Sequence, residues 1–124
     1  MTRFYLNAVL IGILILGISN SSFAQKKPHL SDKEVVIEYA YLELEESMKS
    51  GEFYEWGLET EIKGKFTFDI TIRDKGEVGT IFAISREGEV KDQNDLKDFI
   101  KQYKFNFKMP KTKSYKFQYT FQFK

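Results

Sequence analysis

The chain has 124 residues, enough for one domain, and it contains no cysteine, which excludes disulfides, a lipid-modified cysteine and a cysteine metal site. Its formal net charge is +1, and Arg3 is the only charged residue before Lys26, so residues 25–124 carry 18 basic and 18 acidic side chains. This neutral balance, together with the lack of an Arg-rich or Gly-aromatic motif, argues against a nucleic-acid-binding protein.

Residues 1–24 have the pattern of a secretory signal peptide. The stretch from Leu6 to Ile18 is almost wholly apolar, and Ser22-Phe23-Ala24 puts small residues at the positions that signal peptidase requires. We expect cleavage after Ala24 and a periplasmic or secreted mature protein. The alternative is an uncleaved membrane anchor, although the apolar stretch is shorter than the ~20 residues of a spanning helix.

Residues 25–30 are expected to form a flexible lead, and residues 31–124 a single α+β domain. Ser31 and Glu34 have the spacing of a capping box, and the apolar residues that follow recur every three or four positions. This spacing predicts a helix from Asp32 to about Ser50, ended by Gly51. Residues 52–62 show no clear period and are predicted to form an irregular link.

The middle of the chain predicts a β-hairpin. Apolar residues alternate with polar ones from Phe66 to Arg73, Asp74-Lys75-Gly76-Glu77 has the composition of a turn, and Val78 to Ser85 returns as the partner strand. Gly79 lies inside the returning strand, where a glycine is typical of a bulge.

After this hairpin, an apolar stripe at Leu96, Phe99, Ile100 and Tyr103 predicts a helix over residues 94–104, with Asp92 and Asn94 as candidate caps. Met109-Pro110 is expected to be extended. Residues 115–123 then alternate strictly, with an aromatic ring at every second position, which predicts a strand with one buried and one exposed face. These rings are Tyr115, Phe117, Tyr119, Phe121 and Phe123.

The predicted order is helix, strand, strand, helix, strand. We expect an α+β fold in which a small three-stranded sheet carries two helices packed on one face. A three-stranded sheet has two edges, and the lysines of the last strand are typical of an edge protected against aggregation.

In layout, residues 60–124 resemble the C-terminal domain of TonB-type energy transducers. The resemblance lies in the strand Phe66–Arg73, the turn Asp74–Val78, the strand ending at Ser85, the helix, Met109-Pro110 and the final aromatic strand. The chain lacks the Tyr-Pro that often precedes the family's first strand, and it has a short lead where transducers have a membrane anchor and a long proline-rich spacer. The resemblance therefore implies a detached version of the binding domain, whose exposed last strand pairs with an extended peptide.

From the last strand we predict a partner-binding surface, and the expected partner is a protein of the cell envelope, such as an outer-membrane protein. A homodimer formed through the same edge is a second option. The predicted partner-facing residues are Lys113, Lys116, Gln118, Thr120 and Gln122.

An enzyme is disfavoured, and we predict no catalytic residue, no metal and no cofactor. His29 is the only histidine and cannot by itself form a metal site, and Ser85 has neither a nucleophile elbow nor a histidine base. The carboxylate pairs Glu45–Glu46 and Glu59–Glu61 belong to an acidic stretch that is better explained as a solvated or salt-bridging face. Gly76, Gly79 and Gly88 do not have the spacing of a phosphate loop.

The alternative function is a secreted carbohydrate- or small-ligand-binding protein, with Tyr41, Tyr54 and Trp56 as candidate stacking rings. Charge is also unevenly distributed along the chain. Residues 30–62 hold ten acidic side chains, whereas residues 101–124 hold seven lysines and no acid. We therefore expect either that these two segments lie against each other or that a basic face meets an acidic partner.

Overall fold

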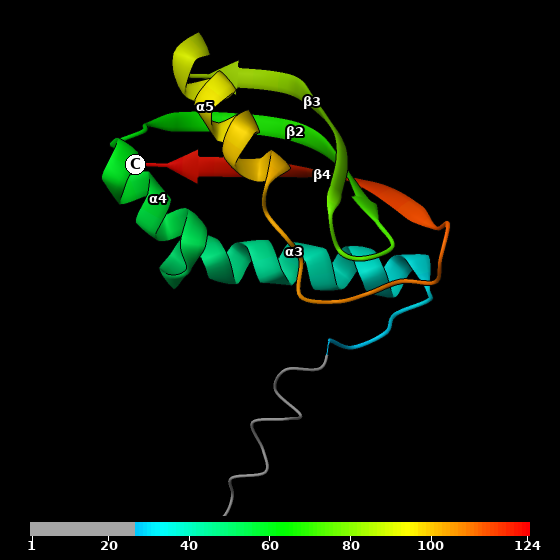
Figure 1. Ribbon diagram of the computed structural model, residues 1–124. Coiled ribbons are helices and arrows are strands. Elements are labelled where there is room, and N and C mark those ends of the chain that lie inside the picture. Colours follow the sequence, from blue (N-terminus) through cyan, green and yellow to red (C-terminus); the bar gives the residue numbers. More distant parts are fainter. Residues whose placement is uncertain (1–26) are drawn as a thin grey trace, which may run out of the picture.

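The computed structural model describes residues 27–124 (Figure 1). The predicted signal peptide, residues 1–24, lies outside the described residues. Within residues 27–124 no helix is both long enough and apolar enough to cross a membrane.

The first helix described, α3, spans Lys33–Ser50, which confirms the predicted helix. Its buried side is formed by Val36, Ala40, Leu44 and Ser47. The predicted capping box is wrong, because Asp32 precedes the helix and no side chain caps its start. At the other end the Gly51 N–H donates to the Ser47 carbonyl and closes the last turn.

A second helix, α4, spans Glu52–Thr60, where the sequence predicted an irregular link. That prediction was wrong because Gly51 ends one helix and directly precedes the next. Phe53 holds α4 in place: its side chain is fully buried, and its ring lies 5.0–5.1 Å from the rings of Phe99, Tyr103 and Phe121. Tertiary packing of one side chain thus stabilises a helix too short to be stable alone.

Three strands form one sheet, as predicted, and the structure shows that it is antiparallel and has the order β3-β2-β4. Strand β2 (Gly64–Arg73) is central, β3 (Val78–Glu87) is its hairpin partner, and β4 (Ser114–Phe123) pairs on its other side. The ladder between β2 and β4 runs without a register shift from Gly64 opposite Phe123 to Arg73 opposite Ser114.

The ladder between β2 and β3 has two register shifts. One lies opposite Thr71, next to Gly79, where a bulge was predicted, and the other lies opposite Thr67 and leaves Ile84 without a pairing partner on β2. The second bulge was not predicted.

Helix α5 spans Val90–Lys101 and starts four residues before the predicted Asn94, with no side-chain cap. It contacts β3 and buries Leu96 and Ile100. After α5 the chain buries every second side chain as it crosses α3. These side chains belong to Tyr103, Phe105, Phe107 and Met109.

The helices cover one side of the sheet, and the apolar faces of β2 and β4 form the core beneath them (Figure 1). The fold class is therefore α+β, with three helices among the described residues instead of the predicted two. The core-facing side chains of the sheet are Phe66, Phe68, Ile70, Ile72, Phe117, Tyr119 and Phe121.

The lead before α3 is hydrogen-bonded to the segment after α5. The Lys108 N–H donates to the Pro28 carbonyl over 2.9 Å, and the Leu30 N–H donates to the Lys108 carbonyl over 2.7 Å. These bonds form a short parallel bridge at His29, which the sequence did not predict.

Candidate binding surface along the last strand

Four of the five predicted partner-facing residues form one row on the exposed side of β4, because side chains alternate along a strand. They are Lys116, Gln118, Thr120 and Gln122. Two of them bond to the neighbouring strand: the Gln118 amide donates to Asp69 Oδ1 over 3.1 Å, and the hydroxyls of Thr120 and Thr67 lie 2.8 Å apart. The fifth residue, Lys113, lies in the turn before β4 and does not belong to this row.

No strand within residues 27–124 pairs with the outer edge of β4. Strand β4 pairs with β2 on one side, and no backbone hydrogen bond within residues 27–124 reaches its other side. Because its register is regular over ten residues, the backbone groups on that side follow the even spacing that a further strand needs.

Helix α3 lies alongside β4 (Figure 1) and is fixed to it by Tyr119. The Tyr119 hydroxyl donates to Glu45 Oε2 over 2.8 Å, and the ring of Tyr41 packs edge-on against that of Tyr119 at 5.3 Å. Burial and the neighbouring Glu45 carboxylate raise the pKa of Tyr119 above its ordinary value, so the hydroxyl stays protonated and remains a donor.

A second bond of this kind fixes the other side of α3. The Tyr103 hydroxyl donates to Glu43 Oε2 over 2.6 Å, and the Asn106 N–H donates to Glu43 Oε1 over 3.0 Å. Burial, followed by Glu43, raises the pKa of Tyr103 in the same way. Glu43 and Glu45 of α3 therefore accept hydrogen bonds from tyrosine hydroxyls, and Glu43 also accepts one from a backbone N–H.

The lysines of the last strand and its ends form no ion pair within the described residues. Within residues 27–124 the two ion pairs are Lys91–Asp95 and Lys104–Glu77, and neither involves Lys113, Lys116 or Lys124. The acidic helix α3 and the basic strand β4 lie close together, which was the first of the two arrangements expected from the uneven charge. No ion pair within residues 27–124 joins them.

An apolar hollow of about 340 Å³ opens at the C-terminal end of β4. One wall comes from α4, where Tyr54 is 44% exposed and Leu58 is 63% exposed. Gly57 lets α4 approach β4 closely, since a Cβ there would lie 2.9 Å from the Phe123 ring. The lining consists of Met48, Tyr54, Gly57, Leu58, Ile62, Gln122, Phe123 and Lys124.

This hollow was missed by the sequence analysis because it joins three segments that are distant in the chain. The signal that could have found it is the i, i+4 spacing of Tyr54 and Leu58, which is typical of one helix face. One predicted residue, Gln122, does line the hollow.

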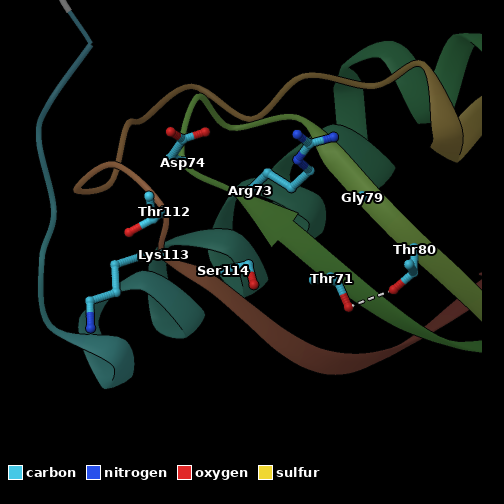
Figure 2. A pocket seen from close by; sticks show the side chains of 8 residues that line it. All are labelled: Thr71, Arg73, Asp74, Gly79, Thr80, Thr112, Lys113 and Ser114. Carbon is cyan, nitrogen blue, oxygen red and sulfur yellow. Dashed lines mark hydrogen bonds between the residues drawn. The ribbon is translucent and has the colours of Figure 1, made fainter.

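A second hollow, of about 550 Å³, lies at the opposite end of the sheet (Figure 2). It contains Arg73 and Lys113, but their side chains point in different directions, and Thr71 and Thr80 bond to each other over 2.8 Å. The charged groups do not converge on a common point, so this hollow does not have the geometry of an anion site.

The three rings proposed for carbohydrate stacking do not form one platform. Trp56 stacks on Phe99 at 4.9 Å with an interplanar angle of 18°, which covers one face of its indole ring. Tyr54 lines the hollow beside β4, whereas Trp56 faces the hollows between α4 and α5.

The residues considered for catalysis are scattered. Ser85 lies on the exposed edge strand β3, Glu59 and Glu61 lie at the exposed end of α4, and His29 is part of the bridge to Lys108. Within the described part of the chain no three His, Cys, Asp or Glu side chains are close enough together to hold a metal ion.

Comparison with known proteins gave no family: no family model, no curated protein and no solved structure matches the chain.

Proposed function

We propose that the protein is a binding module that captures an extended segment of a partner protein along β4. The observation that carries the proposal is the ten-residue, unbulged outer edge of β4, which ends beside an apolar hollow. In this mode of recognition the edge supplies backbone hydrogen bonds, and adjacent pockets select side chains. The layout shared with the TonB C-terminal domain supports the same mode.

The two edges of the sheet differ in how well they suit an added strand. Bulges interrupt β3 beside Gly79 and at Ile84, so its regular ladder with β2 between them is confined to residues 81–83. A bulge twists and disrupts an edge, whereas the even edge of β4 can accept a long segment. This difference favours β4 as the site of capture.

The surroundings of β4 suggest the chemistry of the partner segment. Lys113, Lys116 and Lys124 form no ion pair within residues 27–124. Acidic residues in the partner would therefore be attracted to these lysines, which favours association. The hollow beside Phe123 would take one bulky apolar side chain. The proposed partner is therefore an acidic, extended segment with an apolar anchor.

The proposed location is the periplasm or the medium, after cleavage following Ala24. A protein of the cell envelope, including an outer-membrane protein, is the partner class that this location makes available. The composition of the first 24 residues supports this part of the proposal.

The first test is photo-crosslinking in the organism that encodes the chain, with the photoreactive residue at Gln118. Adducts with one envelope protein would support the proposal and identify the partner. The matched control places the residue at Ser85, which is exposed on the opposite edge strand. Adducts of Gln118 with the protein itself alone would overturn capture at β4.

The second test separates the hollow from the edge. Leu58→Lys places a charge at the mouth of the hollow without touching the core, and we expect the partner identified by crosslinking to bind at least about tenfold more weakly. Val90→Lys is the control, because Val90 has a similar exposure but lies near the other edge of the sheet. Equal binding by both variants would remove the hollow from the proposed site.

A further inference from the structure

The contact between α4 and α5 holds a pair of stacked rings at the protein surface. Trp56 of α4 and Phe99 of α5 stack at 4.9 Å with an interplanar angle of 18°, and both rings are only partly buried. The two rings line two hollows, of about 570 Å³ and about 280 Å³. Because the hollows share this aromatic pair, we describe them together as the α4–α5 groove.

The charged residues that line the α4–α5 groove are all acidic. They are Glu52, Glu55 and Glu59 in the larger hollow and Asp95 and Asp98 in the smaller one. Asp95 forms an ion pair with Lys91, whereas the other four carboxylates form no ion pair within residues 27–124. The groove therefore combines an excess of negative charge with two aromatic rings.

The carboxylates of α4 repel one another in the free protein. Glu52, Glu55 and Glu59 are spaced three and four positions apart, so like charges share one face of a helix that contains no basic residue. Glu59 also lies near the C-terminal end of α4, where the helix dipole disfavours a negative charge. A bound cation would reduce this repulsion, so the free protein is poised to gain from a positively charged ligand.

We propose that the α4–α5 groove docks a basic, arginine-containing segment of a partner protein. Charge complementarity identifies this occupant, and the guanidinium group suits both parts of the groove. It is planar, forms paired hydrogen bonds with carboxylates and packs on aromatic rings. Within residues 27–124 no three of the carboxylates are close enough together to hold one metal ion, so a ligand with several separated charges fits better.

This surface is distinct from the site proposed along β4. The hollow beside Phe123 and the α4–α5 groove share no lining residue, and the segment proposed for β4 is acidic. Docking at the groove therefore does not depend on the proposed function. If both sites are used, the protein can hold an acidic and a basic segment at the same time.

The test is a calorimetric titration of the protein expressed from the full sequence and purified as the cell processes it, with a hexa-arginine peptide as the probe. We expect a Kd below about 100 µM. The salt concentration is about 0.1 M, where the Debye length is about 10 Å, so that distant carboxylates contribute weakly. The fluorescence of Trp56 should also shift, and it reports on the groove because the chain has no other tryptophan.

Paired variants separate the groove from the general acidity of the helices. Glu55→Gln/Glu59→Gln should weaken peptide binding at least about threefold, the effect expected for the loss of two exposed ion pairs. Glu34→Gln/Glu38→Gln is the matched control, because it removes the same charge from exposed positions of α3 and should leave binding unchanged. Glu34 lies about 24 Å along α3 from Ser50, which lines the groove.

Three results would each overturn the inference. One is the absence of hexa-arginine binding at concentrations up to about 1 mM. Another is equal weakening by the two double variants, once circular dichroism has shown that both are folded. The third is binding of spermine as tight as that of hexa-arginine, which would assign the groove to a small polyamine instead of a protein segment.

Discussion

Two tyrosine hydroxyls hold α3 against the rest of the fold, and both donate to a glutamate of that helix. The pair Tyr103–Glu43 joins α3 to the segment after α5, and the pair Tyr119–Glu45 joins it to β4. A hydrogen bond between a neutral donor and a charged acceptor contributes more than one between neutral groups. The acidic side chains of α3 therefore have a structural role that their sequence, which suggested a solvated face, did not predict.

These bonds predict a loss of stability in alkali. The pKa values of Tyr103 and Tyr119 are both raised in the folded protein above the ordinary value of 10.0. The folded state therefore holds the phenolic protons more tightly than the unfolded state, and the corresponding stability is complete below pH 10 and is lost as the pH rises above it. Urea unfolding followed by circular dichroism between pH 8 and 11 should show this decline.

The variant Tyr119→Phe should make the decline shallower, because one of the two linked protons is removed. At neutral pH the same variant should lower the free energy of unfolding by about 1.5–3 kcal/mol, the typical contribution of a hydrogen bond to a charged group. Tyr54→Phe is the control, since Tyr54 is exposed. An unchanged pH dependence in Tyr119→Phe would show that Tyr119 is not one of the titrating groups.

At the scale of elements, α4 depends on one buried ring. Phe53→Ala would remove the ring that contacts Phe99, Tyr103 and Phe121, and it would leave a cavity between α4, α5 and β4. We expect the free energy of unfolding to fall by about 3–5 kcal/mol. The exposed neighbour Tyr54→Ala is the matched control and should cost far less. A loss below about 1 kcal/mol in Phe53→Ala would mean that α4 is held by other contacts.

The hairpin turn depends on Gly76, which adopts a φ of +82°. A Cβ at this position would lie 2.6 Å from the Phe105 carbonyl oxygen, which is closer than van der Waals contact allows. Gly76→Ala should therefore destabilise the protein by about 2 kcal/mol or more, measured by thermal or urea unfolding. Lys75→Ala, one residue earlier in the same turn, should change stability by less than about 0.5 kcal/mol.

The elements that the sequence predicted well are those in which local pattern and burial agree. In β4 every second residue is aromatic, and the structure buries that side, so the exposed row from Lys116 to Gln122 follows directly from the alternation. The helix α3 and the hairpin were predicted for the same reason. The bulge at Gly79 was also predictable, because a glycine in the interior of a strand often marks a bulge.

The features that were missed depend on contacts between distant segments. Helix α4 is stabilised by rings from α5 and β4, and the i, i+4 spacing of Tyr54 and Leu58 is the weak local signal that the sequence around Phe53 offers for it. The hollow beside Phe123 needs α3, α4 and β4 together, and the bulge at Ile84 has no glycine to mark it. In the candidate site, the strand was therefore predictable from the sequence and the hollow was not.

At the scale of the whole molecule, the segment between α5 and β4 ties both ends of the fold together. Its Phe105 and Met109 N–H groups donate to the hairpin turn, at Gly76 and Asp74, and its Lys108 N–H donates to the lead at Pro28. A segment with no helix or strand of its own is thus held by backbone bonds from two sides.

We expect hydrogen exchange to detect this arrangement. The amides of Phe105, Lys108 and Met109 should exchange at least about a hundredfold more slowly than those of Lys111 and Thr112, which lie in the exposed turn that follows. Peptide-resolved mass spectrometry or NMR would measure the difference. Equal exchange rates in the two groups would show that the segment opens independently of the rest of the fold.

The position of β4 in the chain has a consequence for how the protein is made. The central strand β2 is buried between β3 and β4, and β4 begins 41 residues after the end of β2. Synthesis proceeds from the N-terminus, so the hairpin can form early, whereas one of the two strands that pair with β2 is made only when β4 is synthesised. Until then Phe66, Phe68, Ile70 and Ile72 lack the rings of Phe117 and Phe121 that cover them. A nascent chain in which β4 has not yet been synthesised is therefore expected to expose this apolar surface and to be aggregation-prone.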